Sequence, residues 1–92
     1  LSFGAAKGIT ERMMLVRNYK ILILDITDVP RLGVTATLAI EDMVQEAKSN
    51  SRLALVAGAS GRVQERLAKF GVENLVETRK EALETAINKL NV

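Results

Sequence analysis

Cysteine and histidine are both absent from the 92 residues, and only 3% of the residues are aromatic. Disulfide bonds, thiolate nucleophiles, histidine general bases and the usual kinds of zinc site therefore have no residues from which to form. General acid–base and nucleophilic catalysis also lack their usual side chains. We therefore expect neither an enzyme nor a bound metal or cofactor, and the lack of cysteine fits a reducing compartment.

Long apolar runs and one-sided charge are missing as well. No run approaches the roughly 20 apolar residues that cross a bilayer, and residues 1–4 do not read as a signal peptide. The 13 basic and 11 acidic residues are interleaved along the chain. Nucleic-acid-binding proteins cluster Lys and Arg on one face and stack bases on aromatic rings, so we expect no nucleic-acid partner.

What the sequence does contain is an alternation of two hydrophobic periods. Continuous apolar runs at residues 21–26 and 53–57, and a weaker one at 74–76, predict strands covered on both faces. Helical spacing of apolar residues separates these runs. Strand–helix alternation with short connections predicts an α/β fold with a mostly parallel sheet.

Four helices are predicted from these periods. Gly71 is placed to end the third helix, and Thr78 and Glu81 have the spacing of a capping box at the start of the fourth. The apolar stripes, from first helix to last, are Ile9, Met13 and Val16; Leu38, Ala39, Met43, Val44 and Ala47; Val63, Leu67 and Phe70; and Ala82, Leu83, Ala86, Ile87 and Leu90. Residues 1–3 look like the end of a strand, so the chain is expected to begin inside its own domain.

Several stretches resemble the STAS domain family, which runs from bacterial anti-sigma-factor antagonists to the C-terminal domains of SulP anion transporters. Residues 19–30 (YKILILDITDVP) resemble the central strand and exit turn, and residues 32–39 (LGVTATLA) match the segment that opens the next helix. Residues 1–6 (LSFGAA) and 38–42 (LAIED) are similar to the SulP branch, including its bicarbonate transporters.

This resemblance implies one STAS domain over residues 1–92, a fragment of a longer membrane transporter, on the cytoplasmic face of the plasma membrane. The implied fold has about four helices and four or five strands, with the initial strands truncated. The implied role is regulation and dimerisation of a sodium-coupled bicarbonate transporter. The implied partners are the transmembrane domain of the same polypeptide and a second copy, with a nucleotide or a regulatory protein as further candidates. The alternative is a free-standing antagonist-like STAS protein that binds a regulatory partner.

The first candidate site lies where the second predicted helix starts. Thr35 takes the place of the hydroxyl residue that accepts phosphate in the antagonists, and a helix start favours an anion. However, Gly33 stands where the family has an acidic residue, and Val34 replaces the first hydroxyl residue. The simpler interpretation is that Thr35 or Thr37 caps the helix.

The second candidate site is the stretch 58–62 (GASGR), between a strand and a helix. Ligands of open α/β sheets bind at the carboxyl ends of strands, so Gly58, Ser60, Gly61 and Arg62 are candidates for holding an anion or a nucleotide. The stretch lacks the Lys-Ser/Thr ending of a phosphate-binding loop. A turn in which Ser60 caps the helix is the simpler interpretation.

Two further pairs of residues are candidates. Asp25 and Asp28 flank the end of a strand, and an acid there is typical of phosphoaccepting receiver domains. Such domains also need a pair of acids at an earlier strand end, which this sequence lacks, and Asp28 is more simply a turn residue. Met13 and Met14 are adjacent, so one of them points away from the buried stripe. They either contact a partner or fill gaps in the core.

Overall fold

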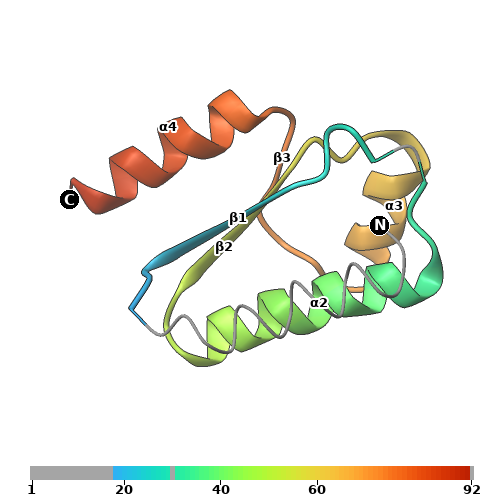
Figure 1. Cartoon of the computed structure of the whole chain (residues 1–92), viewed down its shortest axis with the longest axis horizontal. Helices are drawn as coiled ribbons and strands as arrows, with labels where there is room; N and C mark the ends of the chain where they lie inside the picture. The colour runs from blue at the N-terminus through green and yellow to red at the C-terminus, as the bar shows by residue number, and fades with distance from the viewer. Residues whose placement is uncertain (1–17, 30, 92) are drawn as a thin grey trace.

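A computed structural model describes residues 18–29 and 31–91 of the chain. In chain order their elements are β1 (Ile21–Asp25), α2 (Val34–Ser49), β2 (Leu53–Ala57), α3 (Gly61–Lys69), β3 (Leu75–Val76) and α4 (Arg79–Leu90), as labelled in Figure 1. Among these residues no helix is both long enough and apolar enough to span a bilayer.

The three strands form one parallel sheet in the order β1-β2-β3. The register pairs Ile21 with Leu53 and Val56 with Leu75. The predicted α/β class with a parallel sheet is confirmed, and β2 has the predicted bounds. β1 ends one residue before the predicted run does, although the amide of Ile26 still donates to the carbonyl of Ala57 at 2.9 Å.

Helices cover both faces of this sheet, with α2 and α3 on one side and α4 on the other (Figure 1). Side chains alternate along β1, so Leu22 and Leu24 pack with the cluster under α2 and α3, whereas Ile21 and Ile23 pack with the cluster under α4. The α2 side holds most of the core, including the fully buried Ile40. The core is therefore unequal on the two faces.

The predicted helices are found where the structure describes them, but parts of their apolar stripes are exposed. Ala82 and Ala86 are buried, whereas Leu83, Ile87 and Leu90 are 48%, 55% and 56% exposed. Leu38 and Phe70 are also exposed. The prediction of these five residues as buried is therefore wrong. The apolar stripe of each helix is wider than the surface that the helix packs against, so part of the stripe stays exposed. In α4 it is the alanines that pack against the sheet.

Two predicted helix ends are confirmed. Gly71 has a φ of +83°, in the left-handed region where glycine avoids the Cβ clash, just after the last turn of α3. The Oγ of Thr78 accepts a hydrogen bond from the amide of Glu81 at 3.1 Å and so caps α4.

The predictions for the start of the chain lie outside the described residues. They are the strand end at residues 1–3, the first helix with its stripe of Ile9, Met13 and Val16, and the partner-contact pair Met13 and Met14. Within the described part of the chain there are three helices and three strands, against the four helices and four or five strands that the family resemblance implies.

Candidate functional site

The connecting loops at the carboxyl edge of the sheet are held together by backbone hydrogen bonds. Beyond the bond from Ile26 to Ala57, the amide of Gly58 donates to the carbonyl of Val76 at 3.1 Å. These bonds join the exits of β1, β2 and β3 side by side. Figure 1 shows that α2 and α3 also start at this end of the molecule. This is the edge at which we expected a site.

Gly58 is essential to this junction because the β1 exit lies directly against it. A Cβ at position 58 would lie 2.3 Å from the Oγ1 of Thr27 and 2.6 Å from its Cα, and Gly58 has a φ of +86°. Only glycine fits both the close approach and the left-handed backbone. The contact assigns Gly58 a packing role in the arrangement of the two loops.

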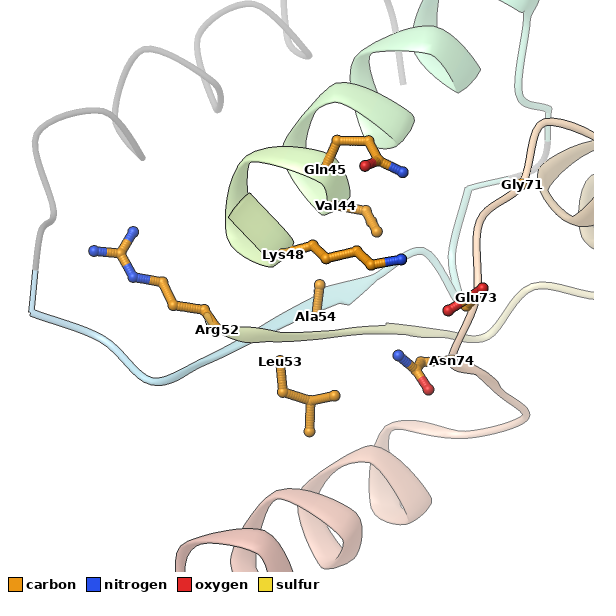
Figure 2. A pocket seen from close by; sticks show the side chains of 9 residues that line it. All are labelled: Val44, Gln45, Lys48, Arg52, Leu53, Ala54, Gly71, Glu73 and Asn74. Atoms are coloured by element: carbon orange, nitrogen blue, oxygen red, sulfur yellow. The ribbon is translucent and has the colours of Figure 1, made fainter. Parts of the chain in front are cut away.

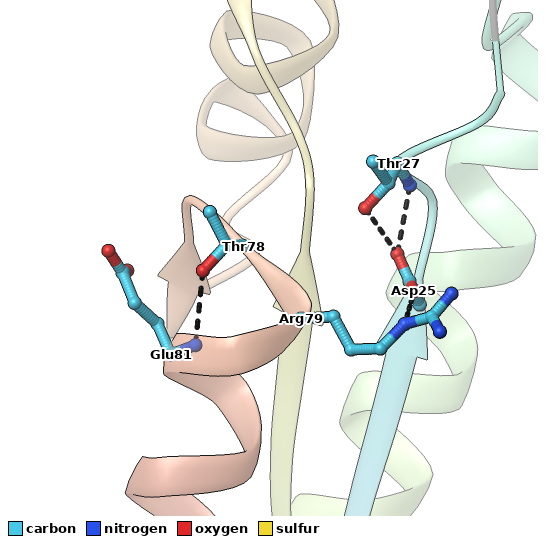
Figure 3. A network of polar contacts seen from close by, with 5 residues as sticks. All are labelled: Asp25, Thr27, Thr78, Arg79 and Glu81. Atoms are coloured by element: carbon cyan, nitrogen blue, oxygen red, sulfur yellow. Dashed lines mark hydrogen bonds and ion pairs between the residues drawn. The ribbon is translucent and has the colours of Figure 1, made fainter.

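Asp25, the last residue of β1, accepts three hydrogen bonds at this edge (Figure 3). Its Oδ1 accepts from the amide of Thr27 at 3.0 Å and from the Thr27 hydroxyl at 2.5 Å. Its Oδ2 accepts from the Nε of Arg79 at 2.5 Å, which forms an ion pair between β1 and the first turn of α4. The two bonds from Thr27, followed by that from Arg79, lower the pKa of Asp25 to about 2.

The start of α4 continues this network. Thr78 caps the amide of Glu81 (Figure 3). In addition, a carboxylate oxygen of Glu81 accepts from the amide of Glu77 at 3.2 Å. This is a variant of the capping box, in which the second bond reaches one residue further back than the N-cap. These two bonds fix the backbone of the first turn of α4, from which the side chain of Arg79 reaches Asp25.

At the start of α2 the two threonines differ. Thr35 is exposed in the first turn, whereas Thr37 is fully buried and its hydroxyl donates to the carbonyl of Gly33 at 2.8 Å. The Nη1 of Arg66 in α3 donates to the carbonyl of Leu32 at 2.7 Å and holds the preceding loop. Of the two threonines, Thr35 is the one whose side chain is accessible to a modifying enzyme.

The second candidate loop is open to solvent at its α3 end. Ser60, Gly61 and Arg62 are exposed, and Ser60 occupies the N-cap position of α3 without a side-chain capping hydrogen bond. Ser60 therefore lies at the predicted N-cap position, but its side chain does not form the hydrogen bond of a helix cap. Arg62 is ion-paired with no carboxylate in the described part of the chain, and its binding of an anion stays a prediction.

A pocket of about 210 Å³ lies toward the opposite, amino edge of the sheet (Figure 2). Charged and amide side chains surround an apolar floor, and the lining residues are Val44, Gln45, Lys48, Arg52, Leu53, Ala54, Gly71, Glu73 and Asn74. The guanidinium of Arg52 also lies 4.2 Å from the ring centroid of Tyr19. None of the candidate site residues proposed from the sequence lines this pocket.

Among residues 18–29 and 31–91, no cluster of three or more carboxylates could hold a metal ion. Sequence reasoning considered Asp25 as a phosphoacceptor but missed Thr27, Arg66 and Arg79. The spacing of Asp25 and Thr27 was a usable signal, because Asx turns join an aspartate to the amide two residues on. Arg79 carried no such local signal, since its partner lies 54 residues earlier.

Comparison with known proteins identifies the family to which this parallel α/β fold belongs. The family model described as "STAS domain" matches residues 1–86. The chain therefore belongs to the STAS domain family, as its residues predicted.

Within that family the chain is similar to the STAS domains of SulP-type transporters. The structure of the SulP transporter STAS domain from Vibrio cholerae has a TM-score of 0.81 and 27% identity, covering 97% of this chain and 75% of that one. A sulfate transporter family protein from Wolinella succinogenes has a TM-score of 0.85 at 22% identity, covering 98% of this chain and 80% of that one, and supports the fold alone.

Two curated relatives are each called "Bicarbonate transporter BicA". The protein from Synechocystis sp. is 36% identical over 91 residues and that from Picosynechococcus sp. is 34% identical over 91 residues. In both cases the match covers 92% of this chain and 16% of the relative. The chain thus spans about a sixth of the length of these relatives.

Proposed function

We propose that this chain is the cytoplasmic regulatory and dimerisation domain of a SulP-type anion transporter, with bicarbonate as the transported anion and sodium as the coupling ion. The observation that carries the proposal is the match of almost the whole chain to about a sixth of two bicarbonate transporters. Because a transporter contains membrane-spanning segments, we expect this domain to work with the transmembrane domain of the same polypeptide. Its lack of Cys and His supports a role without catalysis.

The free-standing antagonist-like alternative is less well supported. A phosphorylatable antagonist needs the acidic and hydroxyl residues that Gly33 and Val34 replace here. Gly33 serves instead as the N-cap residue of α2, with no side chain to offer. We therefore prefer the transporter domain.

Membrane fractionation of the source cells, followed by immunoblotting with an antibody to this domain, tests the assignment. We expect a band several times heavier than this chain that leaves the membrane only with detergent. A small soluble band would contradict the transporter assignment and favour the free-standing protein.

Deletion of this domain from the heavier protein tests its role. We expect loss of the cross-linked dimer and altered bicarbonate uptake, measured with labelled bicarbonate in the presence and absence of sodium. Unchanged cross-linking and uptake would contradict a dimerisation and regulatory role. Sulfate uptake in the same cells is the control for the choice of anion.

Regulation through Thr35 is a further part of the proposal. Thr35 is exposed in the first turn of a 16-residue helix, where unpaired amides and the helix dipole favour a phosphate. Phosphopeptide mapping of the native protein should find phosphate on Thr35, and Thr35→Val should remove the regulation. Thr37→Val is not a suitable control because Thr37 is buried, so Thr85→Val, on a half-buried threonine of α4, is preferable. Repeated mapping that never finds phosphate on Thr35 would rule out this route.

A further inference from the structure

The helix α4 is attached to the sheet through small side chains. Its buried residues are Ala82 and Ala86, which pack with Leu55 and Ala57 of β2. Its large apolar residues Leu83, Ile87 and Leu90 point away from this contact and are about half exposed. The free energy gained from apolar burial scales with the area removed from water. The contact between α4 and the sheet is therefore weaker than it would be if the large apolar residues of α4 were buried.

The rest of the core does not depend on α4. The larger buried cluster joins α2, α3 and the opposite face of the sheet, and it contains no residue of α4. In that cluster Ile40, Val56 and Leu67 are each 0% exposed. Removal of α4 from the sheet would therefore leave this cluster closed.

One ion pair fastens the first turn of α4 to β1. Asp25 is oriented by its two hydrogen bonds from Thr27, and its other oxygen accepts from Arg79. The side chain of Arg79 is 69% exposed and that of Asp25 is 21% exposed. Such an exposed pair is weak and breaks easily in water, which makes it suitable as a fastening that opens and closes.

We propose that α4 is a releasable cover of the sheet, which opens as one unit while the α2 and α3 side stays folded, and that the Asp25–Arg79 ion pair controls how often it opens. Opening uncovers the face of β2 that carries Leu55, which is 2% exposed when α4 is closed. Local opening below the free energy of global unfolding is how small domains expose binding surfaces. The domain thereby has a two-state element whose equilibrium a partner can bias.

Native-state hydrogen exchange of the 92-residue chain, read residue by residue by NMR, tests this inference. In the wild type we expect amides of α4 at residues 83–90 to exchange at least about tenfold faster than those of Ile40 and Val56, after correction for intrinsic rates. Arg79→Ala should speed exchange in α4 about two- to fivefold, the effect of an exposed ion pair, and leave Ile40 and Val56 unchanged.

Lys80→Ala is the matched control. Lys80 is the next residue, carries the same charge in the same turn of α4 and forms no ion pair with the described residues. Both substitutions remove a cation from the start of a helix, so a difference between them reports the ion pair. If Arg79→Ala impairs folding, Asp25→Asn is the alternative, because it keeps one oxygen as the acceptor for Thr27, removes the charge and replaces the acceptor for Arg79 by an NH2 donor.

Two results would overturn the inference. One is exchange of α4, Ile40 and Val56 with a single opening free energy in the wild type. The other is equal acceleration by Arg79→Ala and Lys80→Ala. Neither measurement involves transport, so failure here leaves the proposed function unaffected, and failure of the proposed function leaves this inference unaffected.

Discussion

At the scale of single residues, Gly58 fixes how the exits of β1 and β2 meet. Its left-handed φ and the 2.3 Å approach of a Cβ to Thr27 mean that Gly58→Ala carries both backbone strain and a clash. We expect the free energy of unfolding to fall by about 2–4 kcal/mol. Urea denaturation followed by circular dichroism measures this loss.

Gly33→Ala is the control for that substitution. Gly33 has a φ of −72°, and nothing lies within 4 Å of a Cβ there. The expected loss is less than about 1 kcal/mol, which is the poorer capping by alanine. A loss as large as that of Gly58→Ala would contradict the packing role assigned to Gly58.

Asp25 links the stability of the fold to pH. Its pKa is lowered from 3.8 to about 2 by the hydrogen bonds from Thr27 and then Arg79, so the folded state favours the charged carboxylate. Asp25 therefore stabilises the protein fully above its unfolded pKa, and this contribution is lost as pH falls from about 3.8 to about 2.

Asp25→Asn should therefore flatten the pH dependence of unfolding in this range. Urea midpoints measured from pH 5 to pH 2 give the slope for wild type and variant. Asp42→Asn, at an exposed carboxylate of α2, is the control and should keep the wild-type slope. Equal slopes for wild type and Asp25→Asn would mean that the Asp25 network does not persist in solution.

At the scale of elements, α3 and α4 have hydroxyl residues at the N-cap but use them differently. The Oγ of Thr78 accepts from the amide of Glu81, whereas Ser60 makes no such side-chain bond. Thr78→Ala should cost about 1 kcal/mol. Ser60→Ala should cost less than about 0.5 kcal/mol, as for an exposed side chain without a partner. Thermal unfolding of both variants checks this order, and equal losses would contradict it.

At the scale of the whole molecule, the unequal core predicts unequal sensitivity to substitution. Leu67 is completely buried under α2 and the sheet, whereas Leu83 is half exposed on α4. Leu67→Ala leaves a cavity and should cost about 2–5 kcal/mol, while Leu83→Ala should stay within about 0.5 kcal/mol. Denaturant unfolding of the two variants compares the same chemical change on the two faces. A large loss for Leu83→Ala would mean that this side chain is covered in solution.

The sequence alone determined the features that local signals specify. The bounds of β2, the existence of β3, the helix end at Gly71 and the cap at Thr78 were all predicted. Each depends on residues within a few positions of one another, where apolar runs, the conformational freedom of glycine and capping preferences act directly. The family resemblance, carried by residues 19–30 and 32–39, was also readable from the sequence and is confirmed.

Only the tertiary structure decided which part of each apolar stripe is buried and which distant residues meet. The apolar stripe of α4 includes both alanines and large side chains. Only the alanines are buried, because they are the residues that face the sheet. Asp25 and Arg79 are 54 residues apart, and Gly58 meets Thr27 only because β1 and β2 are neighbours in the sheet. Such contacts depend on how the elements pack, and no periodicity within one element encodes the position of another.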